Sequence, residues 1–174
     1  MSIWIRALCR KSVASVTPKD LLAGISERLL LLTYLYGEDE EDYEEVMSRL
    51  QVENATSTAV FDIYRLHYRE SRRSFIRVAR WSKPEKVASE IEELRESIAE
   101  CQEPQAEIVR LLLAESIETV GFELKPTDAD GMGWPLTIAA AAYLADKGAG
   151  GIYVDGEGWL EPTQTEIRVL LECQ

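Results

Sequence analysis

Histidine and cysteine, the residues that most often bind metals or act as bases and nucleophiles, are scarce in this chain of 174 residues. The only histidine is His67, and the three cysteines, Cys9, Cys101 and Cys173, lie far apart. Zinc sites and catalytic triads draw on histidine, and a disulfide framework needs an even set of cysteines. The scarcity argues against such sites. It predicts a packing or surface role for the histidine and small, buried, reduced cysteines in a reducing cytosol.

The sequence also lacks the glycine-rich loops that hold phosphates. It has no Walker-type motif, no dinucleotide-binding fingerprint after its first predicted strand and no nucleophile elbow. We therefore assign no catalytic residue, and we expect no cofactor.

Long apolar runs are absent as well. The longest apolar cluster covers residues 29–36, whereas a membrane-spanning helix needs about 20 apolar residues. We expect this cluster to belong to a buried helix. A charge at Arg6 comes too early for the apolar core of a secretory signal. These features predict a cytoplasmic protein without a membrane partner.

Basic residues are in short supply, with 19 Lys and Arg against 31 Asp and Glu and a net charge of −12. Nucleic acids and anionic membranes bind cationic protein surfaces. We therefore expect no nucleic-acid partner. A basic protein partner and a purely solubilising role both explain the charge.

The residues that are present describe one globular domain, residues 1–174, with 46% hydrophobic and 29% charged residues. Alternation and β-branched or aromatic runs predict strands at 3–9, 61–69, 75–81, 117–125, 152–154 and 159–160. Three- and four-residue spacing predicts helices at 21–36, 87–98, 106–114 and 135–144. The spacing of Val46, Met47 and Leu50 predicts a short helix that begins inside the acidic run 38–45. Residues 51–59 resemble a loop, and residues 166–173 fit a strand or a helix.

Helix ends carry recognisable signals. Thr17 with Pro18 predicts the start of the first helix, and Ser82 is expected to cap the next long one. Gly37 and Gly148 are expected to end helices. The order strand, helix, strand, strand, helix, strand is the start of a ferredoxin-like split βαβ unit. We therefore expect an α+β fold, an antiparallel or mixed sheet covered by helices, with a C-terminal helix and two strands added.

Two glycine-rich loops hold the strongest candidate binding residues, since each combines carboxylates with a tryptophan. Carboxylates beside glycine can coordinate Ca²⁺ or Mg²⁺. Turn formation and helix capping explain the same acids and glycines without a metal, and we favour that interpretation. Tryptophans at loop edges are frequent in binding sites and in cores. The candidate residues are Asp128, Asp130, Trp134, Asp155, Glu157 and Trp159.

A predicted hairpin reverses the acidic trend, because basic residues are concentrated between Asp62 and Lys83. Arg65, Arg77 and Arg80 are candidates for binding a phosphate or a carboxylate. The same arginines can instead pair with the acidic segment 38–45, within one chain or across a homodimer. A third interpretation is that they are ordinary exposed strand residues that discourage aggregation.

The C-terminal third resembles uncharacterised bacterial α+β proteins. The likeness rests on Asp130-Gly131-Met132-Gly133-Trp134-Pro135, followed by an alanine-rich helix and Val154-Asp155-Gly156-Glu157-Gly158-Trp159. In class and charge the chain is also similar to immunity proteins of bacterial toxin systems, which are small, acidic, cytosolic α+β inhibitors. That resemblance implies inhibition of a basic protein and no enzymatic reaction.

Three functional hypotheses follow. The first is a non-enzymatic interaction protein, such as an immunity-type inhibitor or a small regulator, whose acidic segment meets a basic partner. The second is a small-ligand or divalent-metal-dependent enzyme that uses the carboxylates of loops 128–130 and 155–157. The third is a structural homodimer.

Overall fold

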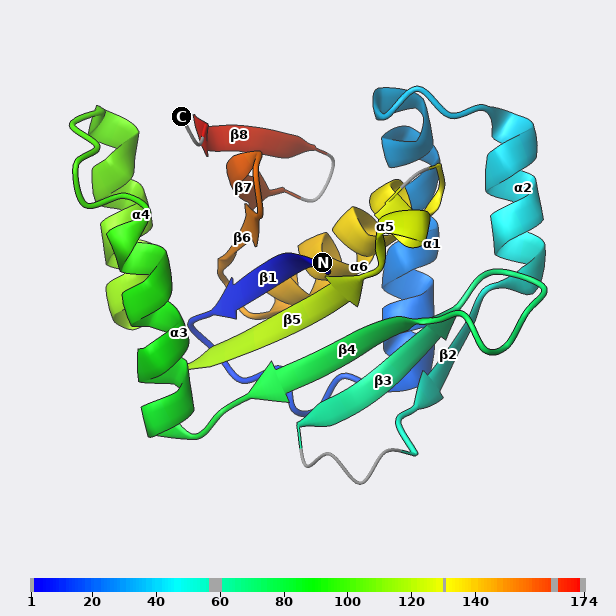
Figure 1. Ribbon diagram of the computed structural model, residues 1–174, viewed down its shortest axis with the longest axis horizontal. Coiled ribbons are helices and arrows are strands. Elements are labelled where there is room, and N and C mark those ends of the chain that lie inside the picture. The colour runs from blue at the N-terminus through cyan, green and yellow to red at the C-terminus, as the bar shows by residue number, and fades with distance from the viewer. Residues whose placement is uncertain (1, 57–60, 130, 164–165, 173–174) are drawn as a thin grey trace.

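The computed structural model contains one eight-stranded sheet in the order β2-β3-β4-β5-β1-β6-β7-β8 (Figure 1). Every neighbouring pair in it is antiparallel. The structure describes residues 2–56, 61–129, 131–163 and 166–172. The strands are β1 (Ile3–Cys9), β2 (Gln51–Asn54), β3 (Asp62–His67), β4 (Ile76–Trp81), β5 (Glu118–Leu124), β6 (Gly151–Val154), β7 (Gly158–Pro162) and β8 (Ile167–Glu172).

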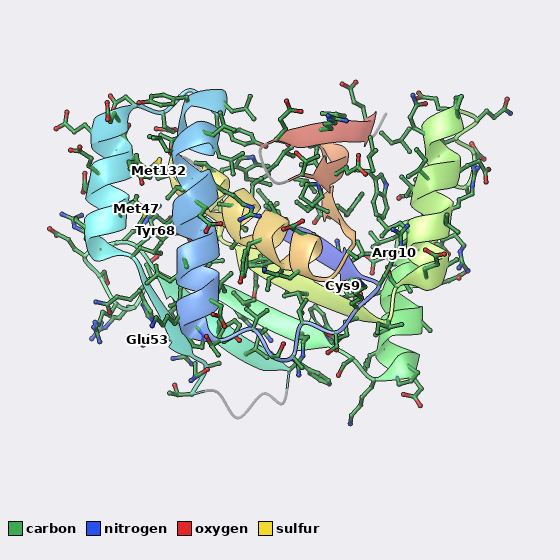
Figure 2. All side chains as sticks on the ribbon, turned by 180° about the vertical axis from the view of Figure 1, so that it is seen from behind. Cys9, Arg10, Met47, Glu53, Tyr68 and Met132 are labelled. Atoms are coloured by element: carbon green, nitrogen blue, oxygen red, sulfur yellow. The ribbon has the colours of Figure 1, made fainter. Side chains whose placement is uncertain are left out.

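Six helices in the described ranges lie on the two sides of this sheet. They are α1 (Pro18–Leu35), α2 (Glu40–Arg49), α3 (Pro84–Glu96), α4 (Pro104–Glu115), α5 (Pro126–Ala129) and α6 (Gly133–Lys147). Figure 2, seen from behind, shows α1 and α6 on the near side of the sheet. None of these helices combines the length and apolar character that a membrane crossing requires.

The main core lies between the sheet and the pair α1 and α6. Alternation along the central strands directs Ile5, Ala7 and Phe122 to this side, where they join the apolar residues of both helices. The alanines of α6 are small, so the helix is buried on nearly all sides. Gly24 of α1 is required here, because a Cβ at this position would lie 2.0 Å from the ring of Tyr143.

A second core covers part of the opposite face. Leu8 of β1 and Trp159 of β7 pack there against α3 and α4, for example against Leu94 and Leu113. Nearer the middle of the sheet, the rings of Trp4 and Trp81 lie 6.1 Å apart. Opposite alternation along the strands thus gives the sheet two apolar layers, one on each face.

The expected α+β class is confirmed, and so are several helix ends. Thr17 caps α1, in a capping box with Asp20, and Pro18 is its first residue. The C-terminal helix and the hairpin after it are present as α6, β6 and β7. Residues 167–172 form strand β8, which decides between the two alternatives for the C-terminal segment.

Other expectations differ from the structure. The ferredoxin-like start is not confirmed, because a split βαβ unit contains parallel neighbours and β1 lies antiparallel between β5 and β6. Residues 51–54, expected in a loop, form β2, a polar strand at the edge of the sheet. The cap of α3 is Lys83 and not Ser82, and no side chain bonds its first turn. The cluster 29–36 is only half buried, since α1 faces the core with one side.

Candidate functional site

Asp128 belongs to the packing between the β3–β4 connection and α6. It is fully buried, and its Oδ1 accepts a hydrogen bond from the Tyr68 hydroxyl at 3.0 Å and from Ser74 Oγ at 3.4 Å. The guanidinium of Arg69 lies 3.5 Å from the same oxygen. Burial, followed by the Asp128 charge, raises the pKa of Tyr68 to about 12. The carboxylate therefore holds two distant segments together, and Tyr68 stays protonated at neutral pH.

The loop before α6 does not use Asp128 as a helix cap. The N-cap of α6 is Met132, and no side chain bonds the first turn. What the sequence does provide is Gly133, where a Cβ would lie 1.8 Å from the Asp128 carbonyl oxygen. Gly131 has a positive φ of 65°, which glycine adopts without strain. Asp130, the other predicted carboxylate of this loop, lies outside the described residues.

Trp134 and Glu157, one from each predicted glycine-rich loop, face the same cavity. Both line a cavity of about 390 Å³ together with Tyr36 and Gly131. Partial burial raises the pKa of the Glu157 carboxyl. Burial also raises the pKa of Tyr36, while a hydrogen bond with Trp134 acts in the opposite direction. Of the residues predicted in the two loops, Trp134 and Glu157 therefore lie at one common cavity.

Asp155 belongs to a different network, on the second face of the sheet. Its Oδ2 accepts from the Trp4 amide at 3.0 Å, and its Oδ1 accepts from Arg6 at 3.0 Å. Arg6 also pairs with Glu90 and Glu93 of α3. Asp155 thus ties the β6–β7 turn to β1. Within the described part of the chain, no group of three or more His, Cys, Asp or Glu residues is placed to hold a metal ion.

The arginines of the β3–β4 hairpin are divided between the two faces of the sheet. Arg65 and Arg77 are register partners and share one face, while Arg80 lies opposite Val120 on the other. Arg77 pairs with Asp62 at 2.6 Å and with Glu123 at 3.1 Å. The expected basic face is therefore split, because residues 77 and 80 differ by an odd number of positions.

The remaining partners of the hairpin also lie outside the acidic segment. Arg65 stacks on Phe75, with the guanidinium carbon 4.7 Å from the ring centroid. Arg72 lies 3.7 Å from Glu53 of β2. The homodimer hypothesis, which needs these cations free for a second copy, stays a prediction.

The acidic segment forms the start of α2 and is partly explained by helix formation. Asp39 and Asp42 make a capping box, in which each side chain accepts from the other residue's amide. Carboxylates in a first helical turn also interact favourably with the helix dipole. Glu40, Glu41 and Glu44 are exposed and make no ion pair with any described residue. Glu41 and Glu44 are therefore available to a partner, and Glu40 is exposed beside Tyr34, with which it shares a hydrogen bond.

Beside them, α1 exposes large apolar side chains. Leu31, Tyr34 and Leu35 are 57%, 52% and 64% exposed. Partial desolvation and the neighbouring Glu40 raise the pKa of Tyr34, which places the two helices' side chains together. We call these residues the α1–α2 surface: Leu31, Tyr34, Leu35, Glu40, Glu41 and Glu44. The sequence contained a signal for this surface, because the helical spacing places Leu31 and Leu35 outside the buried face of α1.

A larger groove lies at the other end of the molecule, and we call it the α3–β8 groove. Residues 96–103 line one side and Tyr153, Trp159, Leu171 and Glu172 line the other, around about 1000 Å³. Trp159, a predicted site residue, is completely buried in its wall. Sequence reasoning missed the carboxylates of residues 96–103, because nothing local indicates that this connection faces β7 and β8.

No protein-family model, no curated protein and no solved structure matches the chain. Its function is therefore inferred from the residues and their geometry.

Proposed function

We propose that this protein is a non-enzymatic interaction protein, of the immunity-type inhibitor or small regulator class, that binds a basic protein through the α1–α2 surface. The observation that carries the proposal is that an exposed apolar strip lies beside carboxylates that form no ion pair with the described residues. Monomeric soluble proteins rarely leave contiguous apolar side chains in water unless they meet a partner.

The apolar strip supplies binding free energy. Leu31, Tyr34 and Leu35 are each more than half exposed. Covering the rest of one such side chain contributes roughly 1 kcal/mol through the hydrophobic effect. Leu31 and Leu35 also border a depression of about 280 Å³ together with Ile167 of β8, into which a partner's apolar side chain fits.

The carboxylates define the partner's charge. Glu40, Glu41 and Glu44 stand at the start of α2, in a chain with a net charge of −12. A surface of one sign accelerates the encounter with a partner of the opposite sign and repels partners of the same sign. A basic protein that presents apolar side chains among its cations therefore fits this surface.

The test uses an amphipathic helical peptide of leucine and lysine as the probe. Binding is measured by fluorescence anisotropy at low and high salt, beside the same peptide with glutamate in place of lysine. We expect the lysine peptide to bind more tightly, and its association rate to fall as salt rises. Glu40→Gln with Glu41→Gln and Glu44→Gln is expected to slow association.

Two leucine variants distinguish specific binding at this surface from nonspecific hydrophobic binding. Leu35→Ser is expected to weaken binding about 5-fold, as loss of roughly 1 kcal/mol implies. Leu111→Ser changes a leucine of α4 that is 54% exposed and is expected to leave binding unchanged. The proposal fails if both serine variants weaken binding equally, or if the glutamate peptide binds as well as the lysine peptide.

A further inference from the structure

The sheet ends in two edge strands, β2 on one side and β8 on the other. Figures 1 and 2 both show β8 along the upper margin of the molecule, with no helix beyond it. β8 pairs with β7 on one side, and no hydrogen bond from another described residue reaches the backbone of its other side. Every second residue of an edge strand directs its N–H and C=O away from the sheet. The outer edge of β8 therefore presents a row of unpaired donors and acceptors.

The two edges differ in how they are protected against further pairing. Native proteins protect edge strands with short length, charge or proline. β2 fits this pattern, since Gln51–Asn54 has four residues and only one of them is apolar. β8 has six residues, four of them apolar, and Val169 is 61% exposed. A bulge opposite Trp159 and Leu160 interrupts the ladder late in the strand, and residues 167–169 before it pair regularly. β8 is therefore the edge that is open to another strand.

Side chains beside this edge form a seat for such a strand. Ile167 and Val169 are two positions apart and point to the face of the sheet that α1 covers, the same face as Leu160. A depression of about 280 Å³ lies there, bordered by Ile167 and by Leu31 and Leu35 of α1. A strand added to β8 carries every second side chain on this face, within contact distance of its cross-strand neighbours. Aliphatic side chains at those positions cover Val169 and enter the depression.

The charge of the chain selects between two sources of this strand. A second copy of the protein would bring a further net charge of −12 to the edge, and charges of one sign repel. A basic protein gains from the same charge. The edge therefore suits a strand from a basic partner better than a strand from a second copy.

We propose that β8 is a strand-addition site, where an extended segment of a basic protein pairs with the outer edge of β8 and places alternate aliphatic side chains against Val169 and the depression beside α1. The inference deepens the proposed function and rests on it for the basic character of the partner. It adds the form of the partner segment. A helix satisfies its own backbone groups, whereas a strand also bonds those of β8.

The probe is the peptide acetyl-Lys-Val-Lys-Val-Lys-Val-amide, whose binding is measured by isothermal titration calorimetry. The control peptide has an N-methyl group on every residue, so it keeps the side chains and loses the backbone donors. We expect methylation to weaken binding at least roughly 10-fold, because hydrogen bonds to β8 are lost. Amide hydrogen exchange of the protein, followed by NMR, locates the site. The unmethylated peptide is expected to slow exchange at the amides of β8 that do not bond β7, and to leave β2 unchanged.

Val169→Thr keeps a β-branched side chain on β8 and replaces a methyl group by a hydroxyl. We expect it to weaken peptide binding roughly 2- to 5-fold, as the lost apolar contact implies. The control Ile117→Thr changes another exposed β-branched residue, 53% exposed beside 61% for Val169, and is expected to leave binding unchanged. Equal weakening by both variants, or peptide binding without slowed exchange in β8, overturns the assignment to this edge.

The peptide acetyl-Glu-Val-Glu-Val-Glu-Val-amide separates this inference from the function on which it rests. Weaker binding of the glutamate peptide, with slowed exchange in β8 for the lysine peptide, supports both. Equal binding of the two peptides at β8 supports strand addition and contradicts the basic partner. Binding of the helical leucine–lysine peptide, with no binding of the extended lysine peptide, supports the proposed function and overturns strand addition.

Discussion

Replacement of Arg6 tests how the second face of the sheet is held together. Arg6 lies on β1, its side chain is 10% exposed, and it contacts carboxylates of Glu90, Glu93 and Asp155 at 3.0–3.2 Å. One guanidinium thereby joins β1 to α3 and to the β6–β7 turn. Arg6→Met keeps much of the apolar stem and removes all three charge-assisted hydrogen bonds.

The exposure of each partner sets the size of the effect. Glu93 is 64% exposed, so its contact contributes less than about 1 kcal/mol. Glu90 and Asp155 are 24% and 38% exposed, and each contact is more strongly shielded from water. Breaking a fully buried ion pair costs about 3–5 kcal/mol, and these partners regain some water. We therefore expect Arg6→Met to lower the free energy of unfolding by about 2–3 kcal/mol.

Arg6→Lys isolates the geometry from the charge. An ammonium group is a point charge without the planar fork of guanidinium, so lysine cannot satisfy all three carboxylates at once. We expect an intermediate loss of about 1 kcal/mol. Both values come from urea unfolding followed by circular dichroism, with linear extrapolation to water.

Arg95→Met is the matched control, since Arg95 makes an exposed pair with Glu92 on α3. Its expected cost is below about 0.5 kcal/mol. Two results would refute the reasoning. One is a free energy of unfolding of Arg6→Met within about 0.5 kcal/mol of the wild-type value, since an exposed ion pair contributes about that much. The other is an equal loss of unfolding free energy in Arg6→Met and Arg95→Met.

Two further predictions concern the packing around Asp128. Gly133→Ala is expected to destabilise the fold by about 3 kcal/mol, because its Cβ would meet the Asp128 carbonyl at 1.8 Å. In Gly37→Ala the added Cβ meets no neighbour and strains only a positive φ, so thermal unfolding should show a decrease of about 1 kcal/mol in the free energy of unfolding. Equal decreases in Gly133→Ala and Gly37→Ala would contradict this prediction. Tyr68, whose pKa rises from 10.0 to about 12 on folding, contributes stability that is present below pH 10 and lost as pH rises towards 12. Unfolding of Tyr68→Phe should depend less on pH in this window, and an unchanged pH dependence would count against the burial of the hydroxyl.

Local signals were sufficient for much of the fold. The start of α1 follows from Thr17 and Pro18, and the alternation of β1 and β5 follows from their apolar residues. Strand β2 escaped prediction because an edge strand with the polar sequence Gln51–Asn54 has no apolar alternation. The strand order is also not encoded locally, since it depends on which strands pair across the whole sheet.

The candidate surfaces also include residues that the sequence indicates locally and residues that only the tertiary fold brings together. Leu31 and Leu35 are readable from sequence, because a helix that faces the core with Leu21, Ile25 and Leu29 must turn them outwards. The predicted loops supplied Trp134, Glu157 and Trp159, but these residues separate into a cavity and a groove. The groove itself joins residues 96–103 to strands that follow much later in the chain. Only tertiary packing creates such a site.

Several arginines of this acidic chain are already paired with carboxylates inside the fold. Arg6 and Arg28 are largely buried, and Arg77 lies between two carboxylates in the sheet. Because the chain has 31 acids and 19 bases, carboxylates without an ion pair remain at the surface even though these arginines are engaged.

The α1–α2 surface and the outer edge of β8 are the two places at which we propose that a partner binds. Salt sensitivity of binding alone cannot identify the site that a basic partner uses, because the net charge of the chain acts at both sites. Local substitutions can identify it. A basic partner that loses affinity with Glu40→Gln and Glu41→Gln uses the α1–α2 surface, and one that loses affinity with Val169→Thr uses the edge of β8.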